Sequence, residues 1–433
     1  MKNILKISFL TLLVSYALFA NVNDDTTSNF KVNKLHLDYL YQEISIDSKA
    51  MGIIHIYCDY PSYKFVEARG EGYACVDDAA RAGLFYLEYF KAYHDTSSLK
   101  KFSLLTNFVL YMQAQNGFFY NFLQSDNTIN KTYRTSVAEP NWWSWRALWL
   151  LSESYKYYNN RDTKRAQILL NSINKCIKAI KRNIRGNFKT KVVDGLLLPN
   201  WLPAGSGADQ SALLIIVLTD YYKFSGDKTI LGYIRSLAKG IMMMQVKDES
   251  SNFNGAFLSW ENTWHSWGNL QSYALLKSYQ ILKDEKVKAS VLKELDLFYP
   301  YLLQSKFLSN FNLRMRGSNV NIFEKKKFPQ IAYDIRPMVF ALLEAFKKTG
   351  ESKYAMLAGD MATWYLGNNP AKQVMYNVNN GIVFDGIIDE DNINMNSGAE
   401  STIETLWALL KISQNKIAVE KLQKSNYYNL LVK

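Results

Sequence analysis

Two adjacent acidic residues, Asp77 and Asp78, stand at the start of an otherwise apolar segment of the sequence. They lie in "GEGYACVDDAARA" (residues 70–82), and the apolar run continues with "GLFYLEYF". Burying an ionised carboxylate without a partner is costly, so such a pair is either neutralised by partners or used in chemistry. The chemistry that two neighbouring carboxyl groups suit is general acid and base catalysis.

The two acids cannot play the same part, because consecutive residues of a helix project about 100° apart. Asp77 has Arg81 at the i,i+4 position, and an ion pair between them is the structural alternative to a catalytic role. We therefore expect Asp78, acting as acid or base, to face a substrate, and keep Asp77 as a second candidate.

A second group of chemically capable residues lies in "FLSWENTWHSWGNLQ" (residues 257–271). Glu261 is surrounded by aromatic residues, which can desolvate a carboxyl group and raise its pKa, as a general acid requires. Glu261 is the predicted partner of Asp78, with Trp264 lining a binding site and His265 contacting the substrate. The alternative is a tryptophan-rich core containing a hydrogen-bonded histidine.

A third group lies in "SVAEPNWWSWRALWLL" (residues 136–151), where Glu139 is a further candidate catalytic acid. Trp142, Trp143 and Arg146 suit a sugar-binding site, and the Arg146 guanidinium could hold a uronate carboxylate. Equally, Pro140 could occupy the first helical position with Glu139 near the cap.

The connection "LLLPNWLPAGSGADQSALL" (residues 196–214) supplies Trp201, and Asp209 follows at a helix start. Both are predicted to bind substrate.

Two later segments complete the candidate site. "QIAYDIRPMVF" (residues 330–340) contains Asp334, a further catalytic candidate that could instead cap the helix before Pro337, and Arg336, a candidate binding residue. "NINMNSGAESTIE" (residues 392–404) offers Asn394 and Glu400 as hydrogen-bonding partners for hydroxyl groups. Glu400 could instead lock the last helix against the first.

The elements that must position these residues are helices of two kinds. Six segments are apolar nearly all round, as helices buried on both sides must be, and they recur roughly every 55 to 70 residues: 75–90, 139–155, 207–222, 261–279, 333–346 and 398–412. Amphipathic segments alternate with them: 97–115, 162–183, 228–245, 284–304 and 352–367. With residues 33–50 as a first outer helix, the pattern predicts an all-α (α/α)6 toroid of six inner and six outer helices.

In such a toroid the inner helices run parallel, so their N-termini meet at one end. Helix N-termini carry unpaired N–H groups that stabilise carboxylates. The acids described above are therefore expected to converge on one cavity, although a single acid at a helix start is more often a cap than a catalyst.

The segments "GYACVDDAARA" and "YLGNNPAKQVMYNVNNGIVFDGIIDEDNINMNSGAEST" resemble those of the six-hairpin glycosidase superfamily. They are similar to a bacterial group of six-hairpin domains with an Asp-Asp-x-Ala-Arg-Ala helix start and a closing Asn-x-Asn-x-Gly-Ala-Glu-Ser-Thr segment. The resemblance implies carbohydrate chemistry, and the superfamily includes glycoside hydrolases, polysaccharide lyases and sugar epimerases.

Residues 1–20, "MKNILKISFLTLLVSYALFA", have the pattern of a secretory signal peptide. We expect an exported protein, periplasmic or secreted, in which residues 21–433 form a single toroid domain with an amphipathic tail from about Ser413. No later segment is long and apolar enough to suggest integral membrane association. The formal net charge of +12 lacks an accompanying nucleic-acid recognition motif, so a nucleic-acid partner is not expected.

Export would permit a disulfide between Cys58 and Cys75, with Cys176 as a buried free thiol. No metal or cofactor is predicted, because no cluster of Cys and His has metal-ligand spacing.

Taken together, the sequence predicts a glycoside hydrolase acting on a poly- or oligosaccharide, with inversion of configuration. An anionic glycan is one option for the substrate, because the chain is basic. The alternatives are a polysaccharide lyase acting on a uronate-containing glycan and a non-catalytic glycan-binding protein. An epimerase is disfavoured, since only His265 lies at an inner-helix mouth.

Overall fold

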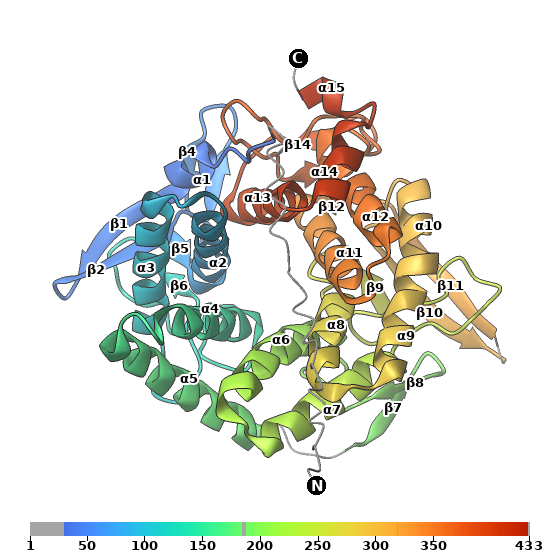
Figure 1. Ribbon diagram of the computed structural model, residues 1–433, viewed down its shortest axis with the longest axis horizontal. Coiled ribbons are helices and arrows are strands. Elements are labelled where there is room, and N and C mark those ends of the chain that lie inside the picture. Colours follow the sequence, from blue (N-terminus) through green and yellow to red (C-terminus); the bar gives the residue numbers. More distant parts are fainter. Residues whose placement is uncertain (1–29, 184–187, 318, 432–433) are drawn as a thin grey trace, which may run out of the picture.

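The computed structural model describes residues 30–183, 188–317 and 319–431. Within these ranges six inner helices form a closed ring, in which each packs against the next and the last packs against the first (Figure 1). They are α2 (Val76–Tyr93), α4 (Trp142–Tyr158), α6 (Ala208–Ser225), α8 (Gln271–Leu282), α11 (Ile335–Thr349) and α13 (Ala399–Ser413). The predicted (α/α)6 toroid is confirmed.

Each inner helix is followed by an outer helix that packs against it. In the described part of the chain these are α3 (Thr96–Tyr111), α5 (Thr163–Asn183), α7 (Lys228–Met243), α9 (Glu285–Lys293), α12 (Ser352–Ala362) and α14 (Lys416–Gln423). α9 continues through a π-helical turn, η1 (Glu294–Phe298), into α10 (Tyr299–Gln304). The outer helices are amphipathic: in α5, for example, Leu169, Ile173 and Ile177 form a buried stripe.

The prediction that residues 33–50 form the first outer helix is wrong. Only α1 (Leu35–Leu40) is helical, and β1 (Tyr41–Ile46) pairs with β2 (Lys49–Ile54) in an antiparallel hairpin. The turn residues Asp47 and Ser48 both adopt positive φ, and alternating exposure along β1 shows a half-buried strand. The sixth outer helix is instead α14, which comes from the predicted tail and packs against α12 and α13. A short helix, α15 (Tyr428–Leu431), follows it.

Short strands occupy the connections and several lead directly into inner helices. β5 (Ala74–Cys75) pairs with β6 (Phe122–Leu123) and runs into α2. β12 (Gln330–Ile331), β13 (Gly386–Ile387) and β14 (Ile393–Asn394) form a sheet in that order, and a 3-10 turn, η2 (Ala332–Asp334), joins β12 to α11. Thus strands fix the chain where several inner helices begin.

The remaining strands form two further hairpins and one sheet. The hairpins are β3 (Tyr57–Asp59) with β4 (Lys64–Val66), and β7 (Thr190–Val193) with β8 (Leu196–Pro199). The sheet has the order β11 (Asn319–Lys326), β10 (Asn310–Arg316), β9 (Thr263–His265). A last 3-10 turn, η3 (Thr363–Leu366), follows α12.

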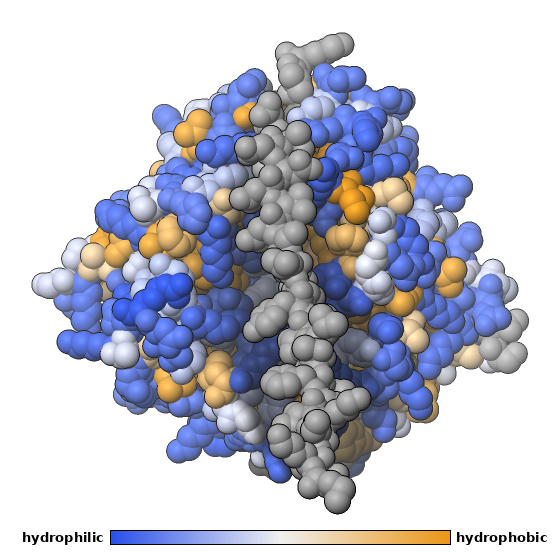
Figure 2. Space-filling model, in the orientation of Figure 1, coloured by the Kyte–Doolittle hydropathy of each residue, from blue (hydrophilic) through white to orange (hydrophobic). Residues whose placement is uncertain are grey.

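One face of the toroid carries mainly polar residues (Figure 2). In Figure 2 the visible part of one face is largely hydrophilic, with apolar residues scattered between polar ones. None of the helices in the described ranges is long and apolar enough to cross a membrane. The predicted signal peptide, residues 1–20, lies outside the described residues.

The disulfide that export would permit between Cys58 and Cys75 is not formed in the structure. Cys58, Cys75 and Cys176 all lie in the described ranges and all are buried free thiols, as predicted for Cys176 alone. The Cys58 thiol donates a hydrogen bond to the Tyr63 carbonyl, whereas the Cys75 thiol contacts Asp78. The two sulfur atoms therefore have separate partners.

Candidate active site

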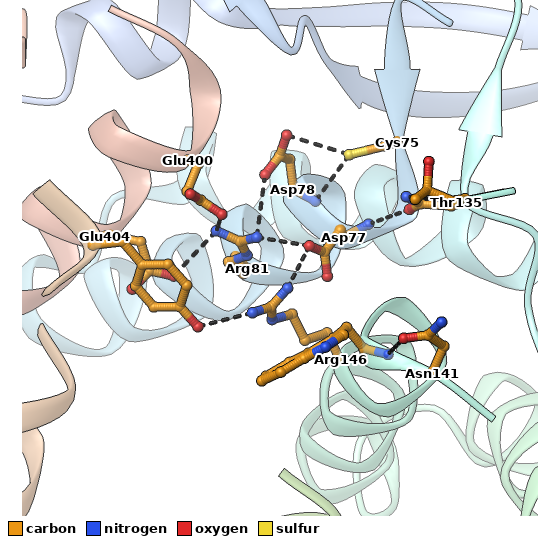
Figure 3. Close-up of polar contacts among 12 residues, drawn as sticks. Cys75, Asp77, Asp78, Arg81, Thr135, Asn141, Arg146, Glu400 and Glu404 are labelled. Atoms are coloured by element: carbon orange, nitrogen blue, oxygen red, sulfur yellow. Dashed lines mark hydrogen bonds and ion pairs between the residues drawn. The ribbon is translucent and has the colours of Figure 1, made fainter. Parts of the chain in front are cut away.

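The Asp77–Asp78 pair occupies the first turn of α2, and the two side chains have different surroundings (Figure 3). Asp77 forms ion pairs with Arg81, at 2.7 Å, and with Arg146 of α4. Although burial opposes ionisation, these two guanidinium groups lower the pKa of Asp77 to about 2. Asp77 is therefore a permanently charged member of an ion-pair network, as its i,i+4 spacing to Arg81 predicts.

Asp78 has the opposite electrostatic character. The residue is 4% exposed, and burial is the main cause that raises its pKa to about 7; Arg81 opposes the rise, and the negative charges of Asp77 and Glu400 add to it. Arg81 lies 3.8 Å from the Asp78 carboxyl group. A carboxyl group that keeps its proton near neutral pH is suited to general acid catalysis.

A cavity of about 340 Å³ opens beside this pair. Among the residues that the structure describes, four carboxyl groups line it: Asp77, Asp78, Asp385 and Glu400. The rest of the wall includes Tyr57, Cys75, Arg81, Asn121 and Ser401. The predicted convergence of Asp78 and Glu400 on one cavity is therefore observed.

Glu400 and Asp385 differ in their access to solvent. The Glu400 side chain is 42% exposed and pairs with Arg81 at 2.8 Å. Asp385 accepts a hydrogen bond of 2.9 Å from the Gly398 backbone, and burial raises its pKa. Of these two acids, Glu400 is the one suited to activating a water molecule.

Asp385 was missed by the sequence analysis, because it lies in a connection rather than at a helix start. The signal that could have found it is the single acid flanked by apolar residues in "GIVFDG". That segment lies inside the stretch that carries the family resemblance.

Behind the cavity, three arginines surround the ring of Tyr333. The guanidinium carbons of Arg81, Arg146 and Arg336 lie 5.2, 5.7 and 5.5 Å from the ring centroid. Arg146 also donates a hydrogen bond of 2.8 Å to the Tyr333 hydroxyl. Since Arg146 binds both Tyr333 and Asp77, it is already engaged and does not present a free guanidinium to a uronate.

Arg336 is likewise a buried structural residue rather than a surface for binding substrate. It pairs with Glu404 of α13, and Glu404 also accepts a hydrogen bond of 3.4 Å from Arg81. This network joins α2, α11 and α13 at their N-terminal ends, which is the ring-closing role that the sequence suggested for Glu400. Glu400 shares that role through its own bond to Arg81.

Asp334 caps the turn that leads into α11. Its Oδ2 atom accepts a hydrogen bond of 3.0 Å from the Ile331 backbone. Burial raises its pKa to about 8, so its carboxyl group is neutral at neutral pH. Asp334 is not among the residues that line the cavity of Asp78.

A second cluster joins Asp209 at the start of α6 to the segment before α8. His265 Nε2 lies 3.1 Å from Asp209 Oδ2, and Nδ1 lies 2.8 Å from the Trp267 carbonyl oxygen. Both ring nitrogens thus lie within hydrogen-bond distance of an oxygen atom. The imidazole holds Asp209 and Trp267 together.

The exposed aromatic surface of this cluster belongs to Trp267 and Trp142. Trp267 is 40% exposed and stacks on His265, with ring centroids 3.8 Å apart. Trp142 lies beside Trp267 at 5.9 Å and also beside Arg146. Trp142 is among the predicted sugar-binding residues.

Two of the other predicted aromatic residues belong to the core, and the third, Trp201, is partly buried. Trp143 is buried and donates a hydrogen bond to the Phe119 carbonyl, and Trp264 is buried against Phe311. Trp201 donates to the Ser236 carbonyl and lines a separate cavity of about 430 Å³.

Three polar candidates lie apart from the cavity of Asp78. Glu139 is exposed and accepts a hydrogen bond from Asn141, and α4 begins only at Trp142. Glu261 pairs with Lys191 of β7. Asn394 lies in β14 and accepts a hydrogen bond from the Asn396 backbone.

The expectation that Glu261 opens an inner helix is wrong. It occupies a tight turn with φ of 49°, β9 follows it at residues 263–265, and α8 begins only at Gln271. Its carboxylate points to a neighbouring hairpin rather than to Asp78.

In the described ranges, no group of three or more His, Cys, Asp or Glu side chains is arranged to hold a metal ion.

No protein-family model matches the sequence, and a comparison with curated proteins finds no match. Solved structures do match over most of the chain. A sugar epimerase from a ruminal bacterium has a TM-score of 0.59 at 14% identity, covering 88% of this chain and 95% of the epimerase. The cellobiose 2-epimerase of Bacillus thermoamylovorans has a TM-score of 0.62 at 11% identity, covering 88% and 96%.

The GH family 9 endoglucanase J30 is also similar, with a TM-score of 0.50 at 13% identity, covering 83% of this chain and 73% of the endoglucanase. At such low identities the likeness concerns the fold. It agrees with the ring of inner helices. The chain therefore shares the (α/α)6 fold of these solved structures.

Proposed function

We propose that the protein is a glycoside hydrolase that acts on a poly- or oligosaccharide with inversion at the anomeric carbon. The observation that carries this proposal is the cavity in which a carboxyl group protonated near neutral pH, Asp78, faces the same space as the half-exposed Glu400. Hydrolysis of a glycosidic bond requires one protonated carboxyl group as acid and a second carboxyl group that can activate water as base.

In the proposed reaction, Asp78 donates its proton to the glycosidic oxygen as the bond from that oxygen to the anomeric carbon breaks. Glu400 accepts a proton from the water molecule that attacks the anomeric carbon from the opposite face. The products are two sugars, one of which carries the new hydroxyl in inverted configuration. Glu400 thereby replaces Glu261 as the partner of Asp78, and Asp385 is the reserve candidate for the base.

The structural neighbours support the substrate class, since they are a sugar epimerase, a cellobiose epimerase and an endoglucanase. The exposed Trp267, next to Trp142, offers a surface on which a sugar ring can stack.

Epimerisation is the activity named for two neighbours, but the histidines of this chain do not favour it. His94 caps the C-terminal end of α2, His36 is buried against the Ser397 carbonyl, and His55 lies in the connection between β2 and β3. None of the four histidines lines the cavity of Asp78, and both ring nitrogens of His265 are engaged. A lyase is disfavoured because Arg146 is already paired and cannot neutralise a uronate.

The test is an assay of purified residues 21–433 against cellohexaose, xylan, α-mannan and polygalacturonate. New reducing ends are expected from at least one glycan, and Asp78→Asn is expected to abolish them, while Glu139→Gln serves as an exposed-carboxylate control. Proton NMR of the first product gives its anomeric configuration.

Other outcomes would replace the proposal. A changed reducing-end sugar without new reducing ends indicates an epimerase, and ultraviolet-absorbing products indicate a lyase. Binding without any product, unchanged in Asp78→Asn, indicates a glycan-binding protein.

We also propose that the protein is exported, to the periplasm or beyond, because residues 1–20 have a signal-peptide pattern. Cell fractionation with mass spectrometry of the mature N-terminus tests this. Cytoplasmic protein that begins at Met1 would refute it.

A further inference from the structure

Cys75 caps the N-terminus of α2 and contacts Asp78, the proposed catalytic acid. It is the last residue of β5 and the N-cap of α2, it is buried, and it lines the cavity that contains Asp78. N-caps are usually Ser, Thr, Asp or Asn, whose oxygen atoms accept strong hydrogen bonds from the first turn. A cysteine at this position calls for an explanation.

Where another helix of the described ranges has a side-chain cap, the cap follows the usual rule. Six such helices are capped by an oxygen atom of Asp or Asn: Asp95, Asn141, Asp162, Asp227, Asp284 and Asn415. Sulfur therefore replaces oxygen at the helix that carries the proposed acid.

Both contacts of the Cys75 thiol are made with a single residue, Asp78. The sulfur accepts a hydrogen bond from the Asp78 backbone N–H at 3.4 Å and donates its proton to Asp78 Oδ2 at 3.2 Å. The first contact fixes the position of the Asp78 backbone. The second fixes the rotation of its carboxyl group, whose other oxygen lies toward Arg81.

We propose that Cys75 is a positioning residue for Asp78: its thiol holds the carboxyl group in one orientation while leaving the proton on the acid. The inference rests on the proposed hydrolase function, in which Asp78 must donate that proton. An S–H group is a weak donor, so it stabilises an ionised carboxylate less than an O–H group would. A serine or aspartate cap would orient Asp78 as well but would change its protonation.

The other charged and titratable groups around Asp78 do not provide this orientation. Each of these groups either bonds to another residue or acts on Asp78 only at longer range. They are Asp77 and Arg81 on α2, Glu400 on α13, Asp385 in the connection before α13, and Tyr57 on β3, whose hydroxyl donates to Glu71. The only short side-chain hydrogen bond to Asp78 in the described residues comes from Cys75.

The variants Cys75→Ser and Cys75→Ala test the inference because they change the donor in opposite directions. The serine hydroxyl is a stronger donor than the thiol and stabilises the ionised form of Asp78 more. It is expected to move the alkaline limb of the pH–activity profile down by about 0.5–1 pH unit, which corresponds to the free energy of one ordinary hydrogen bond. Alanine removes the donor and is expected to move that limb up by a similar amount. Cys58→Ser, at a buried thiol that donates to the Tyr63 carbonyl, is the matched control and should leave the profile unchanged.

A second measurement does not depend on activity. The Raman S–H band of Cys75 in the unmodified protein, assigned by its loss in Cys75→Ser, is expected to shift to lower frequency as Asp78 ionises between pH 6 and 8. The shift should be absent in Asp78→Asn and absent from the bands of Cys58 and Cys176.

The outcomes separate the two proposals. If Asp78→Asn abolishes hydrolysis but the pH profiles of both Cys75 variants match the unmodified protein, the hydrolase proposal stands and the role of Cys75 is refuted. If no glycan is hydrolysed, the hydrolase proposal fails. If the frequency of the Cys75 S–H band also does not change with pH, the contact between Cys75 and Asp78 is refuted as well. Circular dichroism of each variant verifies that it is folded.

Discussion

Replacing Asp78 with asparagine is expected to stabilise the folded protein above neutral pH and to abolish activity. In the native state the pKa of Asp78 rises from 3.8 to about 7, because its carboxyl group is buried beside Asp77 and Glu400. Between those values the folded protein holds a proton that the unfolded chain releases. The stabilising contribution of protonated Asp78 is therefore complete below about pH 4 and is lost as the pH rises through about 7.

The size of the effect follows from the shift. A difference of roughly three pKa units corresponds to about 4 kcal/mol at 1.36 kcal/mol per unit. Asparagine carries no charge at any pH, so the Asp78→Asn protein does not lose this stability as the pH rises. The amide N–H groups of the new side chain need hydrogen-bond partners in the cavity, and this requirement reduces the gain in stability. We expect Asp78→Asn to be about 2–4 kcal/mol more stable than the unmodified protein at pH 8 and about equal to it at pH 4.

Urea unfolding at pH 4, 6 and 8, followed by far-ultraviolet circular dichroism, measures the free energy of unfolding at each pH. Buried Asp334 and Glu294 also have raised pKa values, but they are present in both proteins and cancel in the difference. Asp77→Asn is the matched control, since Asp77 is stabilised by its ion pairs and its loss should destabilise the protein at pH 8. A gain for Asp78→Asn that is the same at pH 4 and pH 8, or a loss at pH 8, would refute the electrostatic reasoning.

Three further substitutions test the other parts of the site. Arg146→Met leaves Asp77 with one cation fewer in a buried position and should cost about 3–5 kcal/mol of stability, measured by urea unfolding; a loss below 1 kcal/mol would contradict the network. Trp267→Ala removes the exposed stacking surface and should raise KM about tenfold with little change in kcat, as steady-state kinetics on an oligosaccharide will show; a loss in kcat alone would argue against stacking. Glu261→Gln should leave kcat/KM within about twofold, because its carboxylate pairs with a surface hairpin; a hundredfold loss would restore it as a catalytic residue.

The fold could be predicted because its signal is repeated. Six helices buried on both sides leave six all-apolar segments, and only a ring accommodates them with amphipathic helices outside. The wrong prediction at residues 33–50 has a local cause. The spacing of Tyr41, Ile44 and Ile46 fits one face of a helix as well as one face of a strand. The turn at Asp47 and Ser48, which both have positive φ, reverses the chain and produces a hairpin instead.

The candidate site could be predicted only in part. Asp78, Asp77 and Glu400 lie in first turns of inner helices, so the position of the helix fixes the position of the side chain. Glu261 and Asp385 lie in connections, where backbone direction depends on pairing with distant strands that a sequence does not reveal. The tryptophans were overassigned because an indole that fills a core and an indole that faces a substrate look alike in sequence.

The cavity lies at the seam where the first inner helix meets the last. Arg81 and Glu404, whose bond crosses that seam, are 323 residues apart in the chain. During synthesis Asp78 emerges long before Glu400, so the working acids are separated until nearly the whole polypeptide is made and the circle closes. Such remote contacts carry a large loop-closure cost and form late. An unfinished chain would therefore lack the assembled cavity, and any activity of this site would report the completion of folding.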